Sequence, residues 1–184
     1  MPLETLRRLS VLGLVALASA GAATLGAGVG QATRSVSAPP AIRAVAHQAP
    51  VVAHCPVPTK LRPAFEAAAR DTDLPASLLY AVAKIESNMK PNARSSAGAR
   101  GLLQLMPGTG GMLALDIDTP TSNVLAGARY LRQMLDEVGS NDLALAAYNA
   151  GPTAVARAGG APSGDVLSYV ANVDEVWRSH AGCR

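Results

Sequence analysis

Apolar residues recur at helical spacing in several segments between residue 59 and the end of the chain. The clearest runs from Asn123 to Val138, where Val124, Ala128, Leu131 and Leu135 share one face. No segment shows the strict apolar–polar alternation of a half-buried strand. The pattern therefore predicts an all-α fold, with a short turn from Leu102 to Met106 that ends at Pro107, and helices over Thr59–Arg70, Leu74–Glu86, Leu143–Tyr148 and Asp165–Trp177. The helix over Leu143–Tyr148 is expected to end at Gly151–Pro152, and Asp165 is the predicted cap of the last helix.

The helix that leads to Glu86 carries a carboxylate on an otherwise apolar face. Asp73 is a candidate cap, and Pro75 suits a first helical turn. Leu79 and Val82 share a face with Glu86, so we expect its side chain to point toward the core. Burial disfavours a charged carboxylate, as does the negative end of a helix dipole, so both raise its pKa. A raised pKa suits a general acid near neutral pH.

The sequence after Glu86 sets this carboxylate apart. No Asp or Glu occurs from Ser87 to Leu115, although Lys90, Arg94 and Arg100 do. The helix alone also allows a second interpretation, in which Glu86 is an ordinary solvated residue of a last helical turn.

The first 58 residues do not resemble a folded domain. Residues 1–30 place Arg7 and Arg8 before an apolar run, and small residues that suit signal cleavage follow at Ala18–Ala20. The run is also long enough for an uncleaved membrane anchor. Residues 31–58 are rich in Pro, Ala and Val, as in a linker. We therefore expect export, with a globular domain over residues 59–184, a length that can bury a core.

The formal net charge of +3 comes entirely from the N-terminal part. Four arginines and Glu4 lie within residues 1–54, whereas twelve basic and twelve acidic residues follow. The predicted domain is neutral, so the basic composition gives no reason to expect a nucleic-acid partner.

Two cysteines, Cys55 and Cys183, bracket the predicted domain. In an exported protein such a pair favours a disulfide over two free thiols, and it would close a long loop. His47, His54 and His180 show no ligand spacing, so we expect neither a metal nor another cofactor.

Four segments reproduce a known pattern in order: Ile85–Ser87, Gly98–Thr109, Ala146–Pro152 and Tyr169–Val170. Together they resemble the catalytic domain of soluble lytic transglycosylases, within the goose-type lysozyme superfamily. The resemblance covers about residues 59–177. It implies a lysozyme-like helical domain that acts on peptidoglycan strands, and it makes the solvated interpretation of Glu86 unattractive.

The resemblance also implies a reaction. One Glu protonates the oxygen between N-acetylmuramic acid and N-acetylglucosamine, then accepts a proton from the muramic acid 6-hydroxyl, which closes a 1,6-anhydro ring. Glu86 would be this acid and base. The implied substrate-binding residues are Ser87, Gln104, Met106, Tyr148, Asn149, Tyr169 and Asp165, which stands where the family often has Glu.

Several points stay open from the sequence. The phenol of Tyr148 is expected to position the carboxyl or the sugar. Tyr169 is expected to approach from the final helix, and the alternative is a core residue with its hydroxyl at the edge. A hydrolytic muramidase on the same fold would need a second acid, with Asp116, Asp118 and Asp165 as candidates. A glycan-binding module without activity is a third interpretation. The oligomeric state is undetermined, and a membrane contact is expected only through an uncleaved N-terminal segment.

Overall fold

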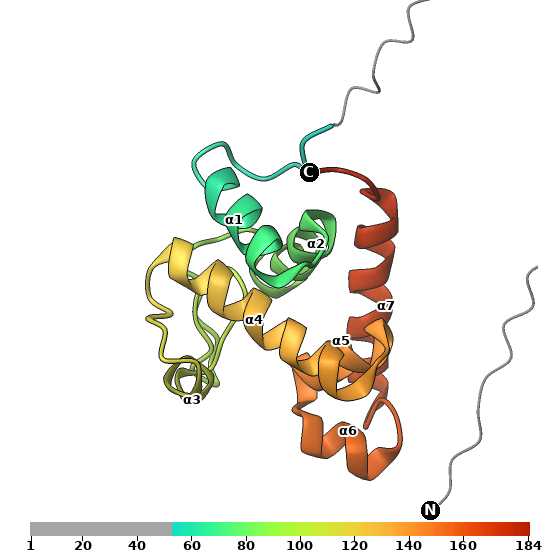
Figure 1. Cartoon of the computed structure of the whole chain (residues 1–184). Coiled ribbons are helices and arrows are strands. Elements are labelled where there is room, and N and C mark those ends of the chain that lie inside the picture. Colours follow the sequence, from blue (N-terminus) through green and yellow to red (C-terminus); the bar gives the residue numbers. More distant parts are fainter. Residues whose placement is uncertain (1–52) are drawn as a thin grey trace, which may run out of the picture. The chain divides into compact units, whose positions relative to one another are not determined.

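The computed structural model describes residues 53–184, and within them it forms seven α-helices and no strand longer than an isolated bridge (Figure 1). This confirms the all-α prediction. In that part of the chain no helix is long and apolar enough to cross a membrane. The helices are α1 (Arg62–Thr72), α2 (Ala76–Ser87), α3 (Pro107–Met112), α4 (Pro120–Val138), α5 (Asn141–Ala150), α6 (Pro152–Ala158) and α7 (Gly164–Ser179).

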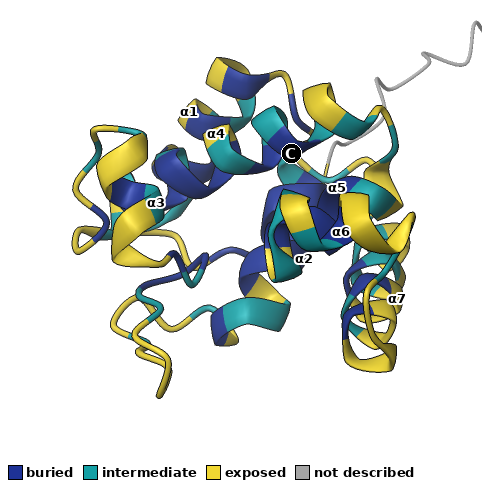
Figure 2. Cartoon of the chain, turned by 90° about the horizontal axis from the view of Figure 1, so that it is seen from below, coloured by how far each residue is buried: buried dark blue, intermediate teal, exposed yellow. Residues whose placement is uncertain are grey.

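Helix α2 lies at the centre of the packing. Every residue from Ser77 to Ala83 is buried, so the helix is covered on all sides rather than along one stripe (Figure 2). It packs against α1 on one side and α7 on another. The Nε1–H of Trp177 on α7 donates to the hydroxyl of Ser77 at 3.1 Å, which satisfies a polar group inside this interface.

Helix α4 crosses the molecule and contacts both α1 and α5. Its predicted stripe is confirmed for Val124, Ala128 and Leu131, which are buried, while Leu135 is half-buried. Gly127 on the same helix has no room for a side chain, because a Cβ there would lie 2.3 Å from Cδ1 of Leu103. The absence of a side chain lets the turn at residues 101–104 pack directly on α4.

Two short helices were not predicted, because each begins at a proline that the sequence suggested as a break. Pro107 begins α3 and Pro152 begins α6. Proline suits this position, because its fixed φ matches a helix and its missing N–H would have no partner in the first turn.

Two predicted helix caps are wrong. Asp73 does not cap α2; it ends α1 in a left-handed conformation with φ of 52°, and Pro75 is the N-cap of α2. Asp165 does not cap α7, because Ser163 precedes the helix and its Oγ accepts the N–H of Val166. Asp165 instead lies exposed in the first turn.

The two ends of the described part are joined covalently and by backbone hydrogen bonds. Cys55 and Cys183 form a disulfide across 128 residues, as predicted. The N–H of Cys55 donates to the carbonyl of Arg184, whose own N–H donates to Ala53. Cys55 and Val57 are buried, so the packed part begins before Thr59. The predicted signal and most of the linker lie outside the described residues.

Reduction of this disulfide should lower the free energy of unfolding by about 4 kcal/mol, because the unfolded chain regains the freedom of a loop of more than a hundred residues. Chemical denaturation with and without reductant measures the change. A Cys55→Ser/Cys183→Ser double variant is the control, since it should be insensitive to reductant. Free thiols in the untreated exported protein, seen by mass after alkylation, would contradict the pairing.

Candidate active site

Glu86 lies in the last turn of α2, where the buried helix meets a cleft. Its side chain is largely covered, and burial raises its pKa from the ordinary 4.5 to about 7. A hydrogen bond from Tyr169 opposes this shift but does not cancel it. Glu86 can therefore hold a proton near neutral pH and also release it, as a general acid and base requires.

Tyr169 on α7 positions the carboxyl group of Glu86. Its O–H donates to Oε1 of Glu86 at 2.8 Å, which leaves Oε2 to carry the exchangeable proton. Tyr169 also packs against the hydrophobic core, so it is a core residue whose hydroxyl reaches Glu86 at the edge. Burial and the neighbouring Glu86 raise the pKa of Tyr169 well above its usual value, so the phenol stays a donor.

The phenol of Tyr148 does not contact the carboxyl group of Glu86, and a contact with a sugar stays a prediction. Its O–H donates to the backbone carbonyl of Leu103 at 2.7 Å and not to Glu86. The ring lies 5.3 Å from that of Tyr130, and both residues line the cleft. Tyr148 therefore supports the cleft wall, and Tyr169 holds the carboxyl.

Gln104 stands in a strained turn beside Glu86. Its backbone has φ of +43°, which an ordinary side chain rarely adopts. Its Nε2 donates to the carbonyls of Gly101 at 2.9 Å and Ala93 at 3.2 Å, so the side chain ties the turn to a preceding loop. Strain of this kind persists where the surroundings fix it, commonly at functional sites.

The cleft has a volume of about 550 Å³ and draws its walls from α2, α3, α4, α5 and the loop between α2 and α3. Four of the predicted site residues besides Glu86 line it: Gln104, Met106, Tyr148 and Asn149. Sequence reasoning missed Ser95, Thr109 and Tyr130. An aromatic residue outside the apolar stripe of its helix was the available signal for Tyr130.

Three predicted site residues do not line the cleft. The hydroxyl of Ser87 is buried and donates to the carbonyl of Ala83 on its own helix at 3.0 Å. Asp165 is exposed on α7. Tyr169 is hydrogen-bonded to Glu86 but is not among the lining residues. A direct contact of any of the three with a ligand in this cleft stays a prediction.

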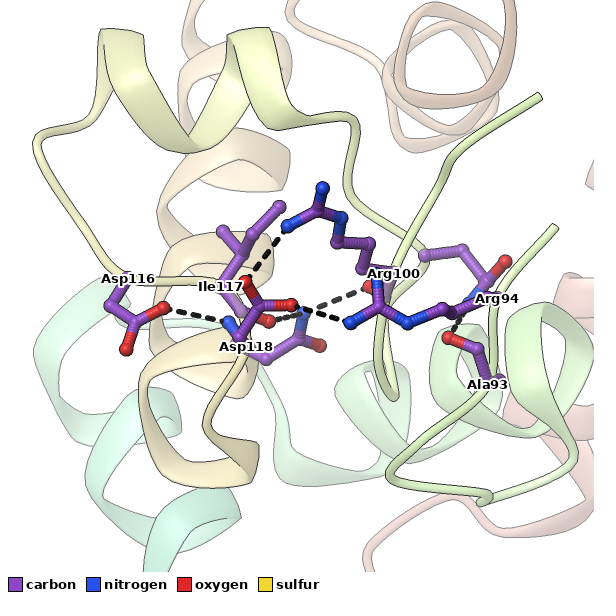
Figure 3. Close-up of polar contacts among 8 residues, drawn as sticks. Ala93, Arg94, Arg100, Asp116, Ile117 and Asp118 are labelled. Atoms are coloured by element: carbon purple, nitrogen blue, oxygen red, sulfur yellow. Dashed lines mark hydrogen bonds and ion pairs between the residues drawn. The ribbon is translucent and has the colours of Figure 1, made fainter.

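Within the described residues, Glu86 is the only carboxylate that lines this cleft. Asp118 pairs instead with Arg94 at 3.2 Å and Arg100 at 2.8 Å, as Figure 3 shows. Asp116 accepts the backbone N–H of Asp118 at 2.9 Å. None of the three candidates for a second acid, Asp116, Asp118 and Asp165, lines the cleft with Glu86. Residues 53–184 also contain no cluster of side chains that could hold a metal ion.

The cleft, the helices around it and the single acid agree with the family comparison. The model of the transglycosylase SLT domain matches residues 63–165, which is more than half of the chain. The chain belongs to this family. The family predicted from the four sequence segments is thereby confirmed.

The similar proteins are named lytic transglycosylases, and the chain matches only a part of each. The chain is 40% identical over 95 residues to membrane-bound lytic murein transglycosylase F 2 of Alkalilimnicola ehrlichii, covering 47% of this chain and 21% of the relative. An inactive glutamate-to-glutamine mutant of lytic transglycosylase Slt from Pseudomonas aeruginosa matches with a TM-score of 0.59 and 29% identity, covering 67% and 24%. The 70-kDa soluble lytic transglycosylase of Escherichia coli matches with a TM-score of 0.57 and 28% identity, covering 69% of this chain and 25% of that protein. The chain thus spans a quarter or less of these proteins.

Glu86→Gln should stabilise the fold, and the gain should depend on pH. The folded state holds the Glu86 proton up to about pH 7, but the unfolded chain loses it near 4.5, so wild-type stability falls as pH rises between these values. The variant should gain nothing at pH 4 and on the order of 3 kcal/mol at pH 8. Urea unfolding at both pH values measures this, and the pH 4 difference reports any packing effect. An equal difference at both pH values would contradict a raised pKa.

Tyr169→Phe should raise the pKa of Glu86 above its value of about 7, because the lost hydrogen bond favoured the charged carboxylate. Carboxyl chemical shifts of ¹³C-labelled glutamate, followed against pH, measure the change. Tyr130→Phe is the matched control, since it removes a phenol that lines the cleft but keeps the bond from Tyr169 to Glu86. A pKa that stays fixed or falls in Tyr169→Phe would show that the phenol does not set the charge of Glu86.

Proposed function

We propose that this chain is a peptidoglycan lytic transglycosylase that cleaves the bond between N-acetylmuramic acid and N-acetylglucosamine. The observation that carries the proposal is Glu86, a carboxyl group with a pKa of about 7 at the wall of a cleft large enough for sugar rings. Membership of the SLT family and relatives named lytic murein transglycosylases support it.

Glu86 acts first as an acid. The protonated carboxyl, held at Oε1 by Tyr169, gives the proton on Oε2 to the bridging oxygen. The bond from that oxygen to the anomeric carbon of the muramic acid breaks, and the N-acetylglucosamine part leaves with the proton. The transition state carries positive charge on the sugar ring, which the new carboxylate stabilises.

Glu86 then acts as a base. The carboxylate accepts the proton of the 6-hydroxyl on the same muramic acid, and that oxygen bonds to the anomeric carbon. The product ends in a 1,6-anhydro ring, no water is consumed, and Glu86 is protonated again. The substrate supplies the nucleophile, so a second protein carboxylate is not required. This agrees with a cleft in which Glu86 is the only acid among the described lining residues.

The other residues that line the cleft provide polar and apolar contacts for the sugars. Gln104, Asn149 and Ser95 offer polar groups for sugar hydroxyls and acetamido groups, while Met106 and Tyr130 offer apolar surface for sugar rings. Met106 is 44% exposed and lines the cleft, so a bound sugar can cover its side chain.

We also propose that the domain acts outside the cytoplasm. The disulfide between Cys55 and Cys183 suits an oxidising compartment, and the relative from Alkalilimnicola ehrlichii is named membrane-bound. Residues 1–30, as a signal or anchor, and residues 31–58, as a linker, would place the domain there.

The products of purified peptidoglycan should test the reaction directly. The released muropeptides should be lighter by one water than hydrolytic products, and borohydride should not reduce their muramic acid ends. Glu86→Gln should abolish turnover, because the amide is neither an acid nor a base near neutral pH. Mass spectrometry before and after borohydride measures both. Reducible ends throughout would show that water is the nucleophile and that the protein is a muramidase.

A fold control accompanies this assay. Glu86→Gln should keep the circular dichroism spectrum of the wild type, so a loss of turnover reports chemistry. Wild-type protein that binds peptidoglycan in a pull-down but releases nothing would indicate a glycan-binding module instead.

A further inference from the structure

Two guanidinium groups converge on one carboxylate beside the cleft. Arg94 donates to Oδ1 of Asp118 at 3.2 Å and Arg100 donates to Oδ2 at 2.8 Å (Figure 3). The side chains of Arg94 and Asp118 are 63% and 47% exposed, so solvent or a ligand can reach this group.

Most of the donors on these arginines are unused. Each guanidinium offers five N–H groups, and within residues 53–184 each makes one side-chain hydrogen bond, to Asp118. Both arginines border a hollow of about 130 Å³, together with Asn92, Gly101 and Asp118. The hollow is large enough for a carboxylate group and presents donors to it.

The charge around the hollow favours an anion. Two arginines and one carboxylate line it, which leaves one positive charge. The carboxylate of Asp116 is directed to the backbone N–H of Asp118 and does not line the hollow. No further acid occurs from Ser87 to Leu115.

The hollow and the cleft share one wall. Arg94 and Arg100 are paired across an isolated antiparallel bridge, and their neighbours Ser95 and Ala99 line the cleft. The ribbon formed by these two segments therefore borders both the hollow and the cleft. A ligand held in the cleft can reach the arginines with a flexible branch that passes the edge of this ribbon.

We propose that Arg94 and Arg100 bind a carboxylate of the stem peptide that branches from muramic acid. This proposal rests on the proposed function, because it names a second part of the same substrate. Three to five peptide residues extend roughly 10–17 Å, a reach that suits a branch passing from the cleft to the hollow. The bond would be a charge-assisted hydrogen bond from one or both guanidinium groups.

Three glycan substrates test the proposal: strands with native stem peptides, strands whose stem carboxylates are converted to amides, and strands without stems. The wild type should show a KM about tenfold lower for native stems than for amidated stems, with similar kcat. The Arg94→Gln/Arg100→Gln double variant should lose this difference and keep its rate on strands without stems. Arg132→Gln is the matched control, because it breaks another exposed arginine–aspartate pair, with Asp136, on the far part of α4.

Equal KM values of the wild type for native and amidated stems would overturn the proposal, as would a double variant that still prefers native stems. Thermal melting checks that each variant is folded. If the double variant unfolds, Arg94→Gln alone keeps the Arg100–Asp118 pair and should lose part of the preference. Failure of the proposed function looks different, because no substrate would then yield anhydro ends.

Discussion

The wall of the cleft depends on the side chain of Asn123, which is fully buried at the start of α4. Its Oδ1 accepts the N–H of Leu103, and its Nδ2 donates to the carbonyls of Arg100 and Ile117, each at 2.9 Å. One amide thus joins three separate pieces of backbone. A buried amide left without partners would cost roughly 1–3 kcal/mol for each group, so the turn around Leu103 has one favourable position.

Other features of the site follow from this anchor. Gly101 must be glycine, because a Cβ there would lie 2.4 Å from the amide nitrogen of Asn123 and its φ is +75°. Leu103 is pressed onto Gly127, and its carbonyl receives the O–H of Tyr148. Gln104, the next residue, is thereby placed at the cleft in its strained conformation. The polar groups of the wall are fixed before any substrate binds, which is the condition for electrostatic catalysis.

Features of the structure that depend on residue spacing along one segment, or on the compartment, can be predicted from the sequence. The stripe of α4, the inward direction of Glu86 and the pairing of Cys55 with Cys183 all follow from spacing or compartment. The cap of α7 was wrong because Ser163 and Asp165 are both good caps by type, and only the backbone decides between them. The sequence also could not show that Tyr169 rather than Tyr148 contacts the carboxyl group of Glu86, because the partner of a buried phenol depends on which helices meet around it. Asn123 looked like an ordinary polar residue near a helix start, since its three partners lie up to 23 residues away.

The fold keeps the other described carboxylates out of the cleft that Glu86 lines, and this matters for the chemistry of Glu86. A second acid near Glu86 would also raise its pKa, but through repulsion that ends once the neighbour is protonated or paired. Here burial is the main cause of the shift, and the first acids that follow Glu86 in the sequence, Asp116 and Asp118, have backbone and arginine partners outside the cleft. The acidity of Glu86 is therefore set by the apolar helix that carries it. A carboxyl group whose pKa is raised by burial can lose its proton and regain it without a change in any other charged group. A reaction in which one carboxyl group is first the acid and then the base requires this.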